Sequence, residues 1–275
     1  MLGRLQYSVA YGAFAYSLDY RPRVSAYLGQ HLGQAISPLW DLVSGDTDAG
    51  TVIRIGEWLL TAAGTVGAGA SGRVSIGINS TGHTVALKRF AVEGDRTRVG
   101  ARRRKLERIT ELARRMDEKR VLRLRDVLQD DAAGGCNRAV DVWFVLEPAV
   151  PSTLMETHKV WSLKDRASRL RHLTRFVAAE LLGALDFLHS NGWIHGDLKP
   201  NNIGVLDQRA ERLQIVLLDV DEVFPLQAEG RLHTYPPGST GGTVGWLSPE
   251  RETMGFDQSC DVWSLGVLIV WLVTG

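Results

Sequence analysis

The hydrophobic pattern of the chain changes near residue 51, and this change predicts where the folded part begins. Residues 1–50 show no clear period and are broken by prolines and by a glycine-containing stretch at 45–50. We interpret them as an N-terminal extension of unknown role that ends in a linker. From residue 51 onward, short runs of apolar and β-branched residues predict strands at 57–61, 73–79 and 84–90. The turn sequence Asn79-Ser80-Thr81-Gly82 joins the last two strands into a β-hairpin.

The next segment has the 3.6-residue period of an amphipathic helix. Over residues 101–120 an apolar stripe follows one face, and most of the other positions are basic. The stripe consists of Leu106, Ile109, Leu112, Ala113 and Met116. We interpret the basic positions as the solvated face of this helix rather than as a nucleic-acid-binding or nuclear-import patch. Two further strands are predicted at 121–128 and 141–146, with a loop at 130–137 between them.

The second half of the chain predicts mainly helices. Residues 152–166 predict a short helix and a loop, and residues 170–189 predict a long core helix. The expected buried side of the long helix consists of Leu173, Phe176, Leu181, Leu182, Leu185 and Leu188. A strand-like run at 213–218 and an irregular segment at 224–242 follow. A last helix is predicted from about residue 260.

Composition narrows the class of protein. The chain has 275 residues, of which 44% are hydrophobic, so it can form one two-lobed domain or two small ones. A net charge of +1 gives no overall field that would attract nucleic acid or a membrane surface. Two cysteines, Cys136 and Cys260, are too few for a disulfide framework at this length. We therefore expect a reduced, intracellular protein, with the cytoplasm as the default compartment.

Neither end of the chain predicts a membrane segment. The apolar run at 265–273 is roughly half the length that a membrane-spanning helix needs, so we expect a buried core helix there. The N-terminus has no compact apolar region with a cleavage site. The first forty residues contain a single acid, Asp19, which leaves a transit segment as an alternative.

The stretch at 195–202, His195-Gly196-Asp197-Leu198-Lys199-Pro200-Asn201-Asn202, carries the most chemistry. It follows the long helix and precedes a strand, and loops in such places often present catalytic side chains. Asp197 can accept a proton from a hydroxyl group, and Lys199 can neutralise a phosphoryl group. Asn202 and Asp219 offer the oxygen ligands that Mg²⁺ prefers. Taken alone, the stretch is equally compatible with a polar turn beside a capped helix end.

A glycine-rich loop and a lysine suggest a phosphate site earlier in the chain. The spacing of Gly67, Gly69 and Gly72 lets the backbone turn tightly and approach phosphate oxygens. Because a strand follows rather than a helix, the glycines lie in a hairpin, which argues against a dinucleotide-binding fold. Lys88, flanked by apolar residues in the next strand, can reach phosphates beneath this loop. The alternative is an edge-strand lysine that faces water.

The order and spacing of these motifs resemble those of eukaryotic-type protein kinases, from about residue 57 to the end of the chain. The resemblance implies an α+β, two-lobed protein-kinase-like fold. Its β-rich N-lobe would span about 51–148 and its mainly helical C-lobe about 149–275. The sequence lacks the last helices of the family's C-lobe, so we expect an incomplete C-lobe with exposed apolar surface.

The resemblance also implies ATP and Mg²⁺ as cofactors, and it assigns roles to individual residues. Asp197 matches the catalytic aspartate and Lys199 the lysine on the γ-phosphate, while Thr243 matches the threonine that braces both. Asn202 and Asp219 match the metal ligands. The positions that match the ATP-binding residues are Gly67, Gly69, Gly72, Val74, Ala86, Lys88, Leu146, Glu147 and Ala149.

Two later motifs extend the resemblance. Ser248-Pro249-Glu250 matches the end of the activation segment, and Asp261 matches the helix aspartate that anchors the catalytic loop backbone. Several positions depart from the family pattern. Gly196 replaces the arginine that pairs with an activation-loop phosphate, so we do not expect switching by such a phosphate. Asp221 replaces a glycine and adds negative charge near the metals, and Gly204 makes the adenine pocket roomier.

The partner of Lys88 stays unassigned from the sequence. Spacing points to Glu107, but the apolar stripe of the 101–120 helix puts Glu107 and Glu111 on the opposite face.

The leading hypothesis is a Ser/Thr protein kinase that transfers the γ-phosphoryl group of Mg·ATP to a protein hydroxyl. Lys199 favours a Ser or Thr substrate, because tyrosine kinases usually carry alanine there. Two alternatives stay open. One is a catalytically weak pseudokinase or scaffold. The other is a small-molecule kinase, since His195-Gly196-Asp197 is similar to the pattern of aminoglycoside and choline kinases. We expect a protein substrate as partner and no nucleic acid, while the oligomeric state is open.

Overall fold

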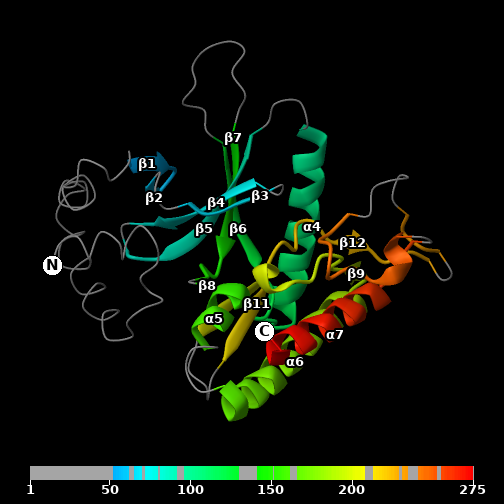
Figure 1. The fold of residues 1–275 in the computed structure, drawn as a ribbon. Coiled ribbons are helices and arrows are strands. Elements are labelled where there is room, and N and C mark those ends of the chain that lie inside the picture. Colours follow the sequence, from blue (N-terminus) through cyan, green and yellow to red (C-terminus); the bar gives the residue numbers. More distant parts are fainter. Residues whose placement is uncertain are drawn as a thin grey trace. The chain divides into compact units, whose positions relative to one another are not determined.

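The computed structural model, drawn as a ribbon in Figure 1, describes most of the chain from residue 52 onward. The described residues are 52–61, 65–69, 72–79, 81–91, 96–129, 141–150, 152–161, 166–207, 213–228, 231–234, 241–252 and 255–274. The predicted N-terminal extension and the predicted loop at 130–137 lie outside them. The chain divides into two compact units, one containing residues up to 101 together with 123–151, and the other containing residues 102–122 together with 152–275.

The first unit is built on one antiparallel sheet. Its strands are β1 (Val52–Ile55), β2 (Trp58–Thr61), β3 (Thr65–Gly69), β4 (Gly72–Ile78), β5 (Thr84–Ala91), β6 (Arg123–Gln129) and β7 (Asp141–Glu147). The strand order is β1-β2-β4-β5-β7-β6, and β3 pairs with β4. The strands predicted from the hydrophobic pattern are confirmed to within about two residues at each end. β1 and β3 are additions that the pattern did not predict.

The hairpin of β4 and β5 owes its register to the turn between the strands. The side-chain Oδ1 of Asn79 accepts hydrogen bonds from the backbone N–H of Thr81 and of His83, at 3.1 and 2.9 Å. Asparagine is favoured in turns because its side chain can bond the backbone in this way. In the resulting register Val74 lies opposite Lys88. One face of the sheet packs its buried side chains together, at Ile55, Trp58, Val85, Leu87, Trp143 and Val145.

Helix α4 (Arg96–Arg115) confirms the predicted amphipathic helix but begins and ends five residues earlier. Leu106, Ile109 and Ala113 are buried, as expected. Met116 is 58% exposed, so its place in the buried stripe was wrong. The helix has already ended there, because the Glu118 N–H donates to the Ala113 carbonyl and Asp117 adopts φ +49°. This is the bonding of a Schellman cap, with aspartate at the position that usually holds glycine.

The second unit combines helices with small sheets. Its helices are α5 (Leu154–Trp161), α6 (Arg166–Ser190) and α7 (Ser259–Thr274), with 3₁₀ turns η3 (Pro200–Asn202) and η4 (Pro249–Glu252). Its strands are β8 (Ser152–Thr153), β9 (Trp193–Ile194), β10 (Ile203–Asp207), β11 (Gln214–Leu217) and β12 (Phe224–Pro225). They form the sheets β11-β10-β8 and β12-β9. Isolated backbone hydrogen bonds also join His233 to Phe256, at 2.8 and 2.9 Å.

Helix α6 is the predicted core helix, but its buried side was partly misassigned. Leu173, Leu181, Leu185 and Leu188 are buried as expected, together with Val177, Ala184 and Phe187. Phe176 and Leu182 are 37% and 54% exposed, so their assignment to the core was wrong. Successive helical positions differ by about 100°, and Leu181 and Leu182 therefore cannot both face the same side.

Helix α7 runs beside α6 in Figure 1 and confirms the predicted last helix. Its Leu265, Leu268 and Leu272 are buried, but several of its other apolar side chains are exposed, namely Val262, Trp263, Val270 and Val273. The expected burial of the 265–273 run is therefore only partly confirmed. None of the described helices is long and apolar enough to cross a membrane.

Candidate active site

The stretch at 195–202 follows strand β9 and ends with the 3₁₀ turn η3. As the sequence predicted, it follows a long helix, and the short strand β9 lies between the two. Pro200 begins η3, where its missing N–H costs no hydrogen bond, and the Asn202 N–H donates to the Lys199 carbonyl at 2.9 Å. This turn brings Lys199 and Asn202 back toward Asp197.

A buried carboxylate anchors the beginning of this loop. Asp261 on α7 is 1% exposed and accepts hydrogen bonds from the backbone N–H groups of His195 and Gly196, both at 2.8 Å. The Nε2 of His189 lies 2.9 Å from the same carboxylate. Burial alone would raise the pKa of Asp261, but the hydrogen bond from His189 and those from the backbone N–H groups of Gly196 and His195 lower it below its ordinary value. Asp261 thus joins α7, α6 and the loop, as the family resemblance implies for this position.

The ring of His195 is held by the loop on one side and by Leu218, the residue after β11, on the other. Its Nε2 lies 2.9 Å from the carbonyl oxygen of Leu218, which can only accept a hydrogen bond. Its Nδ1 accepts the backbone N–H of Asp197 at 3.2 Å. A neutral imidazole with its proton on Nε2 satisfies both bonds. This histidine therefore fixes where the peptide of Asp197 lies, a role that the sequence did not reveal.

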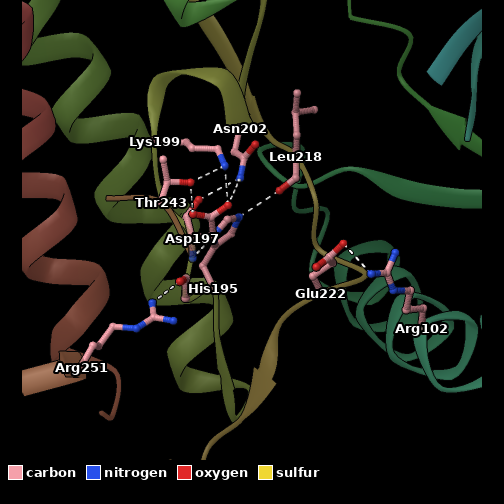
Figure 2. A network of polar contacts seen from close by, with 10 residues as sticks. Arg102, His195, Asp197, Lys199, Asn202, Leu218, Glu222, Thr243 and Arg251 are labelled. Carbon is pink, nitrogen blue, oxygen red and sulfur yellow. Dashed lines mark hydrogen bonds and ion pairs between the residues drawn. The ribbon is translucent and has the colours of Figure 1, made fainter. Parts of the chain in front are cut away.

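Three side chains donate hydrogen bonds to the carboxylate of Asp197, as Figure 2 shows. Oδ1 accepts the hydroxyl of Thr243 at 2.8 Å. Oδ2 accepts the ammonium group of Lys199 at 2.6 Å and the amide of Asn202 at 3.1 Å. The Nζ of Lys199 also donates to the Thr243 hydroxyl at 2.7 Å. The structure thus brings together four residues that the sequence proposed for one site: Asp197, Lys199, Asn202 and Thr243.

The residue before Asp197 is glycine for two structural reasons. Gly196 adopts φ +76°, a conformation that side chains with a Cβ rarely take, and an added Cβ would lie 2.6 Å from the Phe224 ring. Its carbonyl accepts a hydrogen bond from the buried guanidinium group of Arg251, whose Cζ lies 4.2 Å from the centre of the Phe256 ring. Arg251 therefore holds Gly196 through its carbonyl, while Asp261 holds it through its N–H.

We expect Gly196→Ala to destabilise the protein more than Gly192→Ala does. Both glycines have a positive φ, of +76° and +80°, so both variants carry a backbone cost of roughly 1–2 kcal/mol. A Cβ at Gly192 meets nothing within 4 Å, whereas at Gly196 it meets Phe224, which adds about 1–3 kcal/mol of overpacking. Urea unfolding of the two variants measures the difference. Equal losses of unfolding free energy would contradict the close packing of Phe224 against Gly196.

The segment after β11 carries the second proposed metal ligand. Asp219 has φ +55°, uncommon for a residue other than glycine, and is partly exposed. The Leu218 N–H donates to the Asn202 carbonyl at 2.9 Å, which ties the backbone before Asp219 to the other proposed ligand. The amide nitrogen of Asn202 donates hydrogen bonds to the carbonyl and the carboxylate of Asp197. The Oδ1 of Asn202 is therefore the atom that can face a cation. Carboxylate and amide oxygens suit Mg²⁺. No group of three or more His, Cys, Asp or Glu residues that could hold a metal occurs in the described part of the chain.

The proposed nucleotide-binding residues of the first unit lie on its sheet, except Ala149, which follows the end of β7. Gly67 and Gly69 are on β3 and Gly72 begins β4, so the glycine-rich loop is the expected hairpin. Lys88 is on β5, which is flanked by β4 and β7, and it is 2% exposed. The alternative of an edge-strand lysine facing water is therefore wrong. Val74 lies opposite Lys88, and Ala86 lies opposite Leu146 at the end of β7.

Two acidic residues that the sequence analysis considered, Glu147 and Glu107, have basic partners. Glu147, at the end of β7, lies 3.3 Å from Arg125. Glu107 on α4 is exposed and pairs with Arg103 at 2.7 Å. The apolar stripe of α4 thus correctly placed Glu107 on the solvated face.

Comparison with known proteins places these features in a family. The model of the protein kinase domain family matches residues 60–275. The chain is 34% identical over 127 residues to ribosomal protein S6 kinase alpha-2 of Mus musculus, a match that covers 44% of the chain and 17% of the mouse protein. It is 29% identical over 163 residues to serine/threonine-protein kinase PKH2 of Saccharomyces cerevisiae, covering 56% of the chain and 14% of the yeast protein.

A third match covers more of both proteins. Mitogen-activated protein kinase p38a of Drosophila melanogaster is 29% identical over 218 residues, which cover 76% of the chain and 52% of the fly protein. The matched part of the chain thus spans between about a seventh and about half of the length of these relatives. The family match takes in strands of the first unit as well as the loop of Asp197 and helix α7. The chain belongs to the protein kinase domain family, and its fold is the α+β fold of that family.

Proposed function

We propose that this chain is a Ser/Thr protein kinase that transfers the γ-phosphoryl group of ATP to hydroxyl groups of proteins. The observation that carries the proposal is the environment of Asp197. Thr243, Lys199 and Asn202 donate to its two carboxylate oxygens from fixed positions, and its side chain is still 30% exposed. A carboxylate that is held in place yet accessible is what a residue needs in order to orient a hydroxyl group.

The hydrogen-bond count leaves a place for that hydroxyl group. An ionised carboxylate has about four lone-pair sites, two on each oxygen. Oδ2 receives Lys199 and Asn202, whereas among the described residues only Thr243 donates to Oδ1. A substrate hydroxyl can donate to the second lone pair of Oδ1, which fixes the direction from which its oxygen attacks.

The transfer forms one bond to the γ-phosphorus and breaks another. The hydroxyl oxygen forms a bond to the γ-phosphorus, and the bond from that phosphorus to the oxygen bridging the β- and γ-phosphates breaks. Asp197 takes the hydroxyl proton, and ADP leaves. Lys199, held between Asp197 and Thr243 at 2.6 and 2.7 Å, places a positive charge beside the transferred group.

Other residues of the proposed site would hold the nucleotide and Mg²⁺. Oδ1 of Asn202 and the carboxylate of Asp219 are oxygen donors of the kind that Mg²⁺ prefers, and the bound ion would neutralise charge on the phosphates. In the first unit, the ammonium group of the buried Lys88 would pair with phosphate oxygens, and the hairpin of Gly67, Gly69 and Gly72 would cover them. Val74, Ala86, Leu146, Glu147 and Ala149 would bind the adenine.

Two observations support a Ser/Thr rather than a Tyr substrate. Lys199 occupies a position where tyrosine kinases usually carry alanine, and it contacts both Asp197 and Thr243. The yeast relative is named a serine/threonine-protein kinase.

The test is transfer of label from γ-labelled ATP to a generic protein mixture in the presence of Mg²⁺, using the whole chain. Acid hydrolysis of the products identifies the labelled residue. We expect phosphoserine and phosphothreonine, with loss of label in EDTA and in Asp197→Asn. Phosphotyrosine would contradict the substrate class. A folded chain that binds ATP without transferring label would favour a scaffold, and label on added amino sugar or choline would indicate a small-molecule kinase.

A further inference from the structure

Two basic side chains of helix α4 contact the segment that follows Asp219. The Nη2 of Arg102 lies 2.7 Å from Oε1 of Glu222, as drawn in Figure 2, and its Nη1 lies 3.7 Å from Oδ2 of Asp221. One helical turn further on, the Nζ of Lys105 donates to the Val223 carbonyl at 2.6 Å. One face of α4 thus holds three consecutive residues of this segment. We call these contacts the α4 clasp.

Burial makes the clasp a constraint rather than a surface contact. Arg102 and Asp221 are both buried, at 7% and 2% exposure. Burial lowers the pKa of Lys105, and so does the charge of Arg102, whereas Asp221 and Glu222 raise it. Two cations therefore face two anions, and the pair of Arg102 and Asp221 is buried. Removing one member leaves a buried charge without its partner, which is strongly unfavourable.

The clasp bears directly on Asp219. A backbone hydrogen bond from the Glu222 N–H to the Asp219 carbonyl, at 3.0 Å, closes the turn of residues 219–222. Asp219 begins this turn with a positive φ, and Arg102 holds the two residues that end it. Val220 and Val223 are buried on either side of the acidic pair. The direction of the Asp219 side chain is therefore fixed from the far end of a short, closed turn.

We propose that Arg102 is a positioning residue that acts through Asp221 and Glu222 to hold the Asp219 carboxylate where it binds Mg²⁺. This inference rests on the proposed function, because it takes Asp219 as a metal ligand. It also assigns a role to Asp221, which stands where the family has glycine. The charge of Asp221 is turned toward Arg102, so the acid ties α4 to the metal-binding segment.

The test measures how much Mg²⁺ strengthens ATP binding. The dissociation constant of ATP is determined by calorimetry for the whole chain in EDTA and in Mg²⁺. The readout is the constant in EDTA divided by the constant in Mg²⁺, which is large when Mg²⁺ strengthens binding. Asp219→Asn defines the loss of the ligand. Arg102→Gln should lower the ratio about tenfold, at the low end of what groups that orient metal ligands contribute. Arg103→Gln, the adjacent residue of α4 with an exposed pair to Glu107, should leave the ratio unchanged.

A double variant separates positioning from stability. Arg102→Gln with Asp221→Asn removes both members of the buried pair, so it should recover most of the unfolding midpoint that Arg102→Gln loses. Its ratio should stay low, because glutamine is too short to hold both partners. If Arg102→Gln does not fold, the ratio of the double variant alone tests whether Arg102 positions Asp219. A normal ratio in a destabilised variant would show a merely structural role and overturn the proposal.

The design distinguishes two kinds of failure. If the unaltered chain shows no Mg²⁺ enhancement, or keeps it in Asp219→Asn, the assignment of Asp219 is wrong, and this inference fails with the proposed site. If the enhancement is lost in Asp219→Asn but retained in Arg102→Gln and in the double variant, the clasp alone is refuted.

Discussion

Asp197→Asn should lower the rate of phosphoryl transfer by at least ~10²-fold and up to ~10⁴-fold, the range that general-base assistance provides. An amide has nearly the shape of a carboxylate but cannot accept the proton of the substrate hydroxyl. It also loses the charge that holds Lys199 at 2.6 Å. The measurement is the turnover number with a labelled protein acceptor at saturating ATP.

Nucleotide binding should survive this substitution, because Lys88, Asn202 and Asp219 are unchanged. The matched control is Asp186→Asn, which removes an exposed carboxylate of α6 in the same unit and should keep normal turnover. Near-normal turnover in Asp197→Asn would refute the role of proton acceptor. Loss of ATP binding would indicate instead that the substitution disturbs the fold of the loop.

Asp261→Asn should cost roughly 3–5 kcal/mol of unfolding free energy, the penalty for removing one partner from a buried ionic network. The carboxylate is 1% exposed and accepts from two backbone N–H groups and from His189. An amide presents one oxygen and a donor, so at least one of those groups faces another donor. Urea unfolding measures the loss. Asp257→Asn, at a partly exposed cap on the same helix, should cost no more than about 1 kcal/mol.

The same substitution should change how stability depends on pH. The pKa of Asp261 is lower in the folded protein than its ordinary value of about 3.9. The stability that this difference provides is fully present above the ordinary pKa and is lost as the pH falls through the folded pKa. Below about pH 4, stability should therefore fall less steeply in Asp261→Asn than in the unaltered chain. Parallel acid-unfolding curves would show that Asp261 does not carry this dependence.

Local patterns were enough to predict the hairpin around Asn79 and the long helices. A turn residue with its own hydrogen-bonding side chain and a 3.6-residue apolar period are both properties of neighbouring positions. The two-residue strands β8, β9 and β12 have no period that could be recognised. β9 and β12 exist because the chain before and after residues 195–202 is held side by side, as in the pairing of Phe224 with Ile194, and β8 exists because it pairs with β10.

The core face of α6 shows the limit of a hydrophobic pattern. Its leucines fall on more than one side of the helix, so the sequence alone does not decide between Leu181 and Leu182. In the structure, the buried side of α6 is the one that also carries Val177 and Ala184. These residues are smaller than leucine and contribute less to a hydrophobic pattern. A stripe that includes small apolar residues would have identified the correct face.

The motif residues of the site were found because each lies in a short, ordered pattern. Of the residues that support them, Asp261 was found but Arg251 and Arg102 were not. Arg251 and Gly196 are far apart in the sequence, as are Arg102 and Asp221, and no local rule connects either pair. The missing arginine at 196 could be noticed, but only the structure shows that the Phe224 ring fills its space.

The backbone pair between His233 and Phe256 gives Thr243 a thermodynamic advantage. Thr243 belongs to a stretch of roughly twenty residues whose two ends this pair fastens together. A chain closed in this way has already lost much of the freedom of an open one, so ordering its middle costs less entropy. In effect, the hydroxyl group of Thr243 is kept at a high local concentration around Asp197. Its hydrogen bond to the carboxylate can then be weak on its own and still be formed nearly all the time.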